Sequence, residues 1–324
     1  MTAWLLHWWL VPSGSPLLFD YEHLQVKSAV TLNDPQLHGM HAVNLALRLT
    51  LLDLLLRPIG DWFLRPVILG LATLCIVLPG QLRRPPLWIV LAILTTLRVV
   101  LDWPMADNHA YLLSYWCLAV ALALVSRDPR ACLVLNARHL IGLAFACATL
   151  WKVLLSPDYL DGRFFRVLLL TDFRFEGFTR IVGGLTPELL ESLRAFVTQH
   201  VDGQFIAGPD APQEPARFLW LAYVMTWWTV LLESTVAVTF LWPFRGGMAQ
   251  WRQAALLLFC ATTYAVAPVE GFGWLLIAMG IAQCDPAWHK TRLLYLAVFL
   301  LILFYRDEWV MQLLELSSAG GVQK

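Results

Sequence analysis

Five ionisable side chains lie inside long apolar stretches of this sequence: Arg48, Asp53, Arg98, Lys152 and Glu233. A charge in such surroundings is costly, and it often marks a functional site. Each one also has a structural explanation. Arg and Lys near a helix end can extend to a polar boundary, and a pair such as Arg48 with Asp53 can hold two helices together.

Lys152 is the best candidate for chemistry among these side chains. It follows Ala146–Trp151, an apolar run with no acidic residue nearby in the sequence. Apolar surroundings disfavour the ammonium form, so a neutral amine becomes available as a base for proton abstraction. The alternative is a lysine that only extends three or four residues to lipid headgroups.

The composition predicts the elements that must position these groups. Of the 324 residues 59% are hydrophobic and only 14% are charged, whereas a soluble domain has about 25% charged residues. We therefore expect a polytopic membrane protein that contacts lipids. The 23 basic and 23 acidic residues give no excess positive charge for binding nucleic acid. The six cysteines occur singly, without a CxxC, so we predict no metal site and no disulfide framework.

We expect an all-α fold, a bundle of about nine membrane-spanning helices, because each span needs about 20 apolar residues. The predicted spans are 40–57, 66–82, 86–103, 108–126, 136–156, 218–243, 253–269, 271–284 and 291–306. They divide the chain into an N-terminal interfacial segment (1–36), spans one to five (37–156), a long connection (157–217), spans six to nine (218–306) and a short tail (307–324).

Loop charges predict the orientation of these spans. The loops after spans two, four, six and eight are basic, whereas those after spans three and seven hold only acidic charges. By the positive-inside rule the N-terminus is cytoplasmic and the long connection lies outside. The N-terminus lacks the basic region and cleavage site of a signal peptide, which fits a bacterial inner membrane.

The long connection contains a clear helix signal. Thr186 and Pro187 are suited to the N-cap and first position of a helix. An apolar stripe follows at helical spacing, formed by Leu189, Leu190, Leu193, Phe196 and Val197. The stretch 163–180 before it mixes apolar residues with four arginines. We expect both stretches to form helices that lie on the outer membrane surface.

The predicted orientation places several polar groups at one depth of the outer face. They come from four different spans and are Asp102, Asn108, His109, Lys152 and Glu270. A chance scatter would divide them between the two faces. Convergent polar groups in an apolar bundle indicate a binding or catalytic site.

Two short stretches carry a resemblance to a known family. Asn108-His109-Ala110-Tyr111-Leu112 resembles the Asn-His-Ser-Tyr-Leu run of the vitamin K-dependent gamma-glutamyl carboxylases. About forty residues later, Lys152 is followed by the segment 156–162, Ser-Pro-Asp-Tyr-Leu-Asp-Gly. This is similar to the lysine, acid-aromatic and glycine pattern of that family and of the bacterial HTTM-domain proteins.

The resemblance implies a cofactor, a reaction and roles for these residues. In the family, a lysine base deprotonates a vitamin K hydroquinone, and reaction with oxygen then drives glutamate carboxylation and epoxide formation. Lys152 would be the catalytic base, and His109 would be a catalytic residue that holds or polarises the oxygenated cofactor by a hydrogen bond. Asn108 and Tyr111 of the similar stretch, with Asp102 and Glu270 of the polar groups at the same face, would bind the cofactor, a menaquinol-type hydroquinone, and a protein or peptide would be the substrate.

Two departures from the family pattern leave other functions open. The family has a Phe-His pair where this sequence reads Phe259-Cys260-Ala261, and its large luminal domain has no counterpart in 313–324. The alternative is a non-enzymatic accessory or scaffold subunit of a membrane complex, in which the polar groups are tied up in ion pairs. A third possibility is a transporter with a cavity near Glu233.

Overall fold

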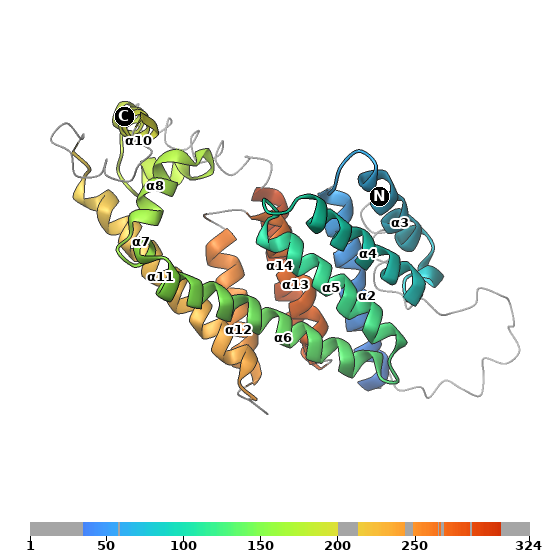
Figure 1. Cartoon of the computed structure of the whole chain (residues 1–324). Helices are drawn as coiled ribbons and strands as arrows, with labels where there is room; N and C mark the ends of the chain where they lie inside the picture. The colour runs from blue at the N-terminus through green and yellow to red at the C-terminus, as the bar shows by residue number, and fades with distance from the viewer. Residues whose placement is uncertain are drawn as a thin grey trace, which may run out of the picture. The chain divides into compact units, whose positions relative to one another are not determined.

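The computed structural model describes residues 35–305 apart from 58, 200–212, 244–248, 265, 267–268 and 286. Over this part of the chain the structure is helical and contains no strand, which confirms the predicted all-α class (Figure 1). The predicted tail (307–324) and all but the last two residues of the predicted N-terminal segment (1–36) lie outside the described residues.

Five of the described helices begin at a proline: α2, α4, α6, α7 and α10. Proline suits the first turn of a helix because its fixed φ is already helical and its missing N–H leaves no bond unmade. The elements are α2 (Pro35–Leu56), α3 (Leu64–Val77), η1 (Pro79–Gln81), α4 (Pro85–Leu101), α5 (Asn108–Val125), α6 (Pro129–Leu150), η2 (Trp151–Leu155), α7 (Pro157–Leu160), α8 (Arg163–Thr171), η3 (Phe173–Phe175), α9 (Glu176–Ile181), α10 (Pro187–Gln199), α11 (Ala216–Leu241), α12 (Ala249–Tyr264), α13 (Glu270–Gln283) and α14 (His289–Tyr305).

Within the described part of the chain, three helical stretches are long and apolar enough to cross a membrane: Asn108–Val125, Pro129–Leu155 and Ala216–Leu241. They correspond to the predicted spans four, five and six. Three further stretches are apolar but shorter: Leu64–Val77, Pro85–Leu101 and Gly271–Gln283. None of them reaches the length of about 20 residues that a span needs. The three long helices are consistent with a membrane protein.

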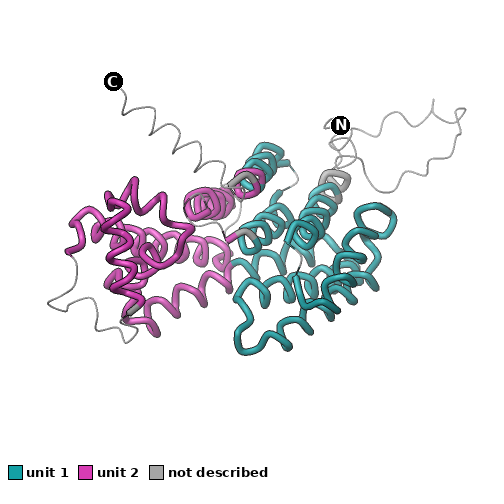
Figure 2. Tube along the Cα trace, turned by 90° about the horizontal axis from the view of Figure 1, so that it is seen from above, with its two compact units in different colours: residues 1–141, 271–299 teal, residues 142–270, 300–324 magenta. Residues whose placement is uncertain are grey.

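The described chain divides into two compact units (Figure 2). Unit 1 is formed by residues 1–141 and 271–299. Its α13 is apolar on all sides, and every residue from 273 to 284 is buried, as expected of a helix without a polar face. The ring of Trp274 on α13 stacks on Phe299 of α14 at 5.2 Å between centroids. Gly280 leaves room for Tyr295, since a Cβ there would lie 2.7 Å from its ring.

Polar contacts join the outer helices of unit 1 to α2 and to each other. Trp116 of α5 donates a hydrogen bond to the Thr50 hydroxyl of α2 at 2.8 Å. Thr96 of α4 and Ser114 of α5 share a hydrogen bond of 2.6 Å. Such bonds satisfy the polar groups of apolar helices and fix the helix register.

Unit 2 is formed by residues 142–270 and 300–324. In it α6 packs closely on α11, because Gly142 has no side chain: a Cβ there would lie 2.7 Å from Leu241 Cδ2. The α12 helix packs on α11 as well. Arg252 of α12 donates to the Thr239 carbonyl at 3.1 Å, an acceptor in the last turn of α11 that the helix itself leaves without a partner.

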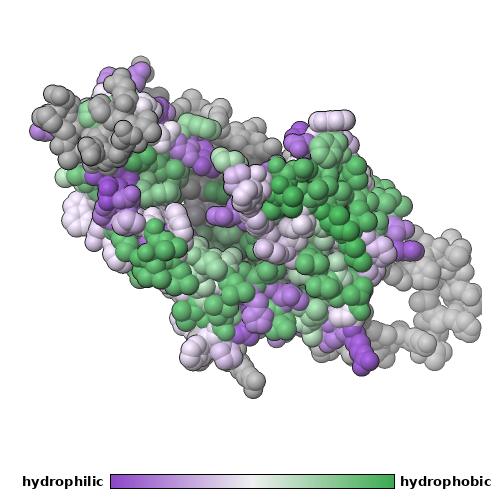
Figure 3. All heavy atoms as spheres, in the orientation of Figure 1, coloured by the Kyte–Doolittle hydropathy of each residue, from purple (hydrophilic) through white to green (hydrophobic). Residues whose placement is uncertain are grey.

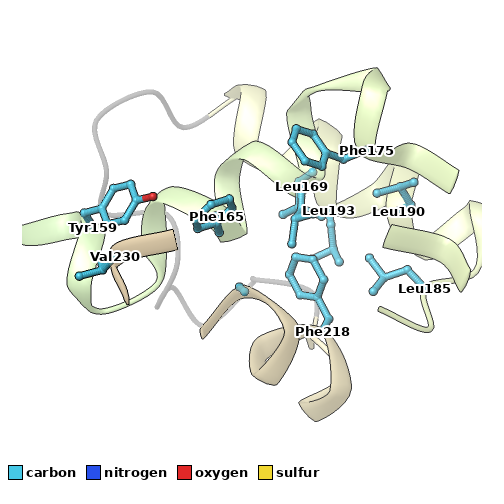
Figure 4. Packing of buried hydrophobic residues seen from close by; sticks show 11 residues of the cluster. Tyr159, Phe165, Leu169, Phe175, Leu185, Leu190, Leu193, Phe218 and Val230 are labelled. Carbon is cyan, nitrogen blue, oxygen red and sulfur yellow. The ribbon is translucent and has the colours of Figure 1, made fainter. Parts of the chain in front are cut away.

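The long connection folds into a helical cap, defined here as residues 157–199, with its own apolar core against α11 (Figure 4). Thr186 caps α10 by accepting the Leu189 N–H at 3.3 Å, and the predicted apolar stripe is the buried side of this helix. The stripe residues Leu190 and Leu193 lie in one cluster with Phe218 of α11. The stripe therefore packs on protein, and the position of this helix on the outer membrane surface stays a prediction.

Apolar side chains also cover much of the outer surface of both units (Figure 3). On α4 the exposed residues include Ile93, Val100 and Leu101, and on α11 they include Trp220, Val224 and Leu231. Outward apolar faces of this extent suit helices surrounded by lipid or by other helices.

Candidate functional site

The most distinctive polar contact of unit 2 is an ion pair between Lys152 and Glu233, in which Lys152 Nζ donates to Glu233 Oε1. The two residues are 81 positions apart in the sequence. Only 14% of the Lys152 side chain and 8% of the Glu233 side chain are exposed. Both lie on helices that are long and apolar enough to span a membrane, so each charge has a partner where a lone charge would be costly.

Local sequence explains why Lys152 lies where α6 ends. The helix continues after Leu150 as one π-helical turn, η2. It ends before Ser156, whose backbone is not helical (φ −124°, ψ 84°), because the following Pro157 disfavours the helical conformation at the residue before it. The contacts Gly142 with Leu241 and Lys152 with Glu233 show that α6 and α11 run antiparallel. Single π turns in long helices frequently occur at functional sites.

Tyr159 of α7 completes the surroundings of the lysine. Its ring centroid lies 5.0 Å from Lys152 Nζ, a cation–π arrangement. The ring is buried and stacks on Phe164 at 4.9 Å between centroids. Burial, together with the nearby Glu233 charge, raises the pKa of the Tyr159 hydroxyl, so this group stays neutral at ordinary pH.

The cap reaches this site through Gly162, which begins α8 with a left-handed backbone (φ 84°). A Cβ at Gly162 would lie 3.6 Å from the Tyr223 Cα of α11. Glycine adopts this conformation without the steric cost that other residues have. The turn therefore brings the cap onto the α11 backbone only a few residues after Tyr159.

Three buried oxygen atoms of unit 2 have no hydrogen-bond partner among the described residues: Glu233 Oε2, Thr149 Oγ1 and Tyr264 Oη. Thr149 lies one turn before Lys152, and the Glu233 charge acts on the Tyr264 hydroxyl. A buried polar atom without a partner costs about 1–3 kcal/mol. One carboxylate oxygen is thus held by the lysine, while the other is open to a hydrogen-bond donor.

Four residues predicted for the site lie in unit 1. His109 Nε2 is 3.5 Å from Asp107 Oδ2, with 19% of its side chain exposed. Asn108 is exposed and begins α5, and Tyr111 is half-buried one turn later. Asp102 follows α4 and accepts from Arg98 Nε at 3.2 Å.

More charged side chains surround His109 than the sequence indicated. The charges of Arg57, Arg98 and Asp107 all act on the imidazole. Arg57 also pairs with Asp53 at 3.6 Å, and its guanidinium occupies the space that a side chain at Gly271 would need. Charged side chains that follow α2, lie in α4 and precede α5 therefore act on this histidine.

Glu270, the remaining predicted residue, begins α13 and belongs with Lys152 to unit 2. The convergence of the unit 1 residues with Lys152 stays a prediction. Among the residues that the structure describes, no three His, Cys, Asp or Glu side chains are grouped so that they could hold a metal ion.

Sequence reasoning did not assign Glu233 to the site, although it identified Glu233 as a charge inside a span. A signal existed, because Lys152 lies near the end of one predicted span and Glu233 within the next. Two consecutive spans run antiparallel, so their charges can meet. The pairing needed the helix register, and that depends on the close contact at Gly142.

The fold and the site thus define an all-helical protein with candidate membrane-spanning helices and a buried Lys–Glu pair. No protein-family model, no curated protein and no solved structure matches the chain.

Proposed function

We propose that this protein is a membrane enzyme of the carboxylase-like class, which takes a proton from a membrane-soluble quinol at the Lys152–Glu233 pair. The reaction would be an oxygen-dependent carboxylation or epoxidation at the outer face of a bacterial inner membrane. The observation that carries the proposal is the buried ion pair whose second carboxylate oxygen, Glu233 Oε2, has no hydrogen-bond partner.

The pair can accept a proton in two ways, which differ in the acceptor atom. In the first, a proton passes from the Lys152 ammonium to Glu233 and leaves an amine beside a carboxyl group. The amine then accepts the hydroxyl proton of the substrate. Alternatively Glu233 Oε2 accepts it directly, while the Lys152 ammonium stabilises the anionic oxygen that is formed. In both cases the pair gains one proton and the substrate loses one.

Two features of the described residues support a hydroquinone as the ligand. Glu233 Oε2 is an orphaned acceptor that a phenolic hydroxyl can satisfy, and the rings of Tyr159 and Phe164 provide an aromatic border. When bound, the hydroquinone would supply the acidic hydroxyl and the reducing electrons of the reaction. Tyr159 keeps the Lys152 ammonium in place by the cation–π contact.

Quinol-dependent oxygen consumption by the purified protein tests the proposal, with chemically reduced menaquinone-4 as the probe. Removal of a general base lowers rates by about 10²–10⁴-fold, so we expect losses of this size for Lys152→Ala and Glu233→Gln. The matched control is Arg163→Gln, which removes an exposed arginine that pairs with Asp158 and Asp161 on the cap surface. Wild-type protein that consumes no oxygen with several quinols, or a Lys152→Ala protein that remains fully active, would overturn the proposal.

A second function is favoured by a specific observation. Lys152 and Glu233 neutralise each other, and large apolar side chains are exposed on α4 and α11, as a non-enzymatic scaffold or accessory subunit would require. This function predicts that the double variant Lys152→Met/Glu233→Leu keeps its association with neighbouring subunits. The size of the complex extracted from membranes in mild detergent measures that association.

A further inference from the structure

The contacts between α11 and α12 fix which of their residues lie side by side. Trp228 of α11 donates to the Thr262 hydroxyl of α12 at 3.3 Å, and Arg252 of α12 donates to the Thr239 carbonyl of α11 at 3.1 Å. The two helices therefore run antiparallel, and the α11 residues just after Trp228 lie beside the α12 residues just before Thr262.

Two polar side chains, those of Glu233 and Tyr264, lean from opposite directions toward the place where Trp228 contacts Thr262. Side chains on a helix tilt toward its N-terminus. Glu233 on α11 therefore leans back toward Thr229, and Tyr264 at the end of α12 leans back toward Cys260. The ring of Tyr264 accordingly makes an edge contact with Phe259, at 5.9 Å between centroids. The Glu233 charge acts on the Tyr264 hydroxyl, as this arrangement requires.

Both residues are more than nine-tenths buried: Tyr264 is 1% exposed and Glu233 is 6% exposed as whole residues. Among the described residues neither Tyr264 Oη nor Glu233 Oε2 has a hydrogen-bond partner. Buried polar atoms of native proteins are almost always satisfied. A phenol hydroxyl that can donate and a carboxylate oxygen that can only accept together match one chemical group, a hydroxyl, which accepts one hydrogen bond and donates another.

We propose that Tyr264 and Glu233 form a binding site for the hydroxyl group of a phenolic ligand. Tyr264 donates a hydrogen bond to the ligand oxygen, and the ligand hydroxyl donates to Glu233 Oε2. Glu233 thus distinguishes a quinol from a quinone, because a quinone carbonyl has no hydrogen to donate to the carboxylate, while Tyr264 positions the ligand oxygen. This role rests on the proposed function only for the identity of the phenol as a quinol.

Binding of radiolabelled 1-naphthol tests this site without any turnover. Equilibrium dialysis of the detergent-solubilised full chain compares 1-naphthol with its methyl ether, which cannot donate to Glu233. One hydrogen bond contributes about 0.5–1.5 kcal/mol, so we expect the ether to bind wild type about three- to tenfold more weakly. We expect Tyr264→Phe to weaken 1-naphthol binding by a similar factor. The control Tyr223→Phe removes an exposed hydroxyl on α11 and should bind like wild type.

Equal binding of 1-naphthol and its ether to wild type would overturn the site, since the two buried atoms would then hold water alone. Unchanged 1-naphthol binding by Tyr264→Phe would overturn the role of Tyr264. The ether comparison uses only wild-type protein, so it decides the question even when the variant does not fold. Weakened binding by Tyr264→Phe together with no quinol oxidation by wild type would contradict the proposed reaction and leave the hydroxyl site standing.

Discussion

The two units neutralise their buried charges in different ways. In unit 1, Arg57 pairs with Asp53 and Arg98 pairs with Asp102, each four residues apart at one helix or its end. In unit 2, Lys152 pairs with Glu233, 81 residues away on another helix. A pair within one helix forms as that helix forms. The unit 2 pair forms only when α6 and α11 pack together, so its energy depends on tertiary structure.

This difference shows which ion pairs affect the packing of one helix against another. Local pairs are worth a few tenths of a kcal/mol in exposed helices, and they keep arginine tolerable in an apolar segment. A pair between helices fixes the register of those helices, and breaking it leaves an uncompensated buried charge. Variants of the two kinds of pair should therefore differ strongly in their effect on stability.

The largest effect is expected when one partner of the unit 2 pair is removed. Glu233→Leu leaves the Lys152 ammonium buried without a counter-charge, and we expect the free energy of unfolding to fall by about 3–5 kcal/mol. The double variant Lys152→Met/Glu233→Leu should recover most of this loss, because well-packed apolar residues can replace a buried pair. Denaturant titration in detergent micelles measures both. A double variant as unstable as the single one would contradict this account of the pair.

A smaller loss of stability is expected at the turn of the cap that packs against the α11 backbone, at Gly162. Gly162→Ala forces an L-residue into a left-handed conformation (φ 84°), which costs about 1–2 kcal/mol. The matched control is Gly80→Ala in unit 1, where an added Cβ meets nothing within 4 Å and φ is not positive. We expect the control to unfold at the wild-type temperature or above it. Equal shifts of the midpoint in both variants would mean that the turn is unstrained.

A still smaller effect is expected for the local pair of unit 1. Arg98→Gln removes a charge whose partner Asp102 has 35% of its side chain exposed, so water can solvate the remaining carboxylate. We expect a loss below about 1 kcal/mol, measured in the same titration as Glu233→Leu. A loss as large as that of Glu233→Leu would show that the local pair of unit 1 and the pair between helices of unit 2 contribute equally to stability.

The smallest effect is expected for a local pair in the cap, and it depends on pH. Hydrogen bonds from Arg174 hold the pKa of Asp172 below its usual value of 3.8. A lowered folded-state pKa stabilises the protein above the unfolded pKa, and this stability is lost as pH falls from about that value through the lowered one. Asp172→Asn should therefore lower the unfolding temperature slightly at neutral pH, with the difference from wild type shrinking below pH 3.8. A difference that stays constant with pH would show that the carboxylate charge contributes nothing.

Much of the fold could be predicted from local patterns. The helical class follows from composition, and the Thr186 cap with the apolar stripe of α10 follows from spacing alone. What the stripe packs against could not be predicted. Sequence periodicity shows that one side of a helix is apolar, and it does not distinguish a lipid surface from the side of another helix. Phe218 of α11 supplies that partner here.

The candidate site could be predicted in the same partial way. Lys152 stands out because a lysine in an apolar run is expensive, and this signal needs only the sequence. Its partner Glu233 and the open atoms of Glu233 and Tyr264 depend on how three helices align. That alignment comes from contacts such as the close approach at Gly142, which no local pattern encodes.

The burial of α13 has a consequence for the order in which the protein is made. The ribosome synthesises α2 to α5 well before residues 271–299, which complete unit 1. Until α13 emerges, unit 1 lacks a helix that is buried at every residue from 273 to 283. Unit 1 must therefore wait for more than a hundred residues of unit 2 to be translated. A ribosome stalled before Gly271 would leave unit 1 without a finished core.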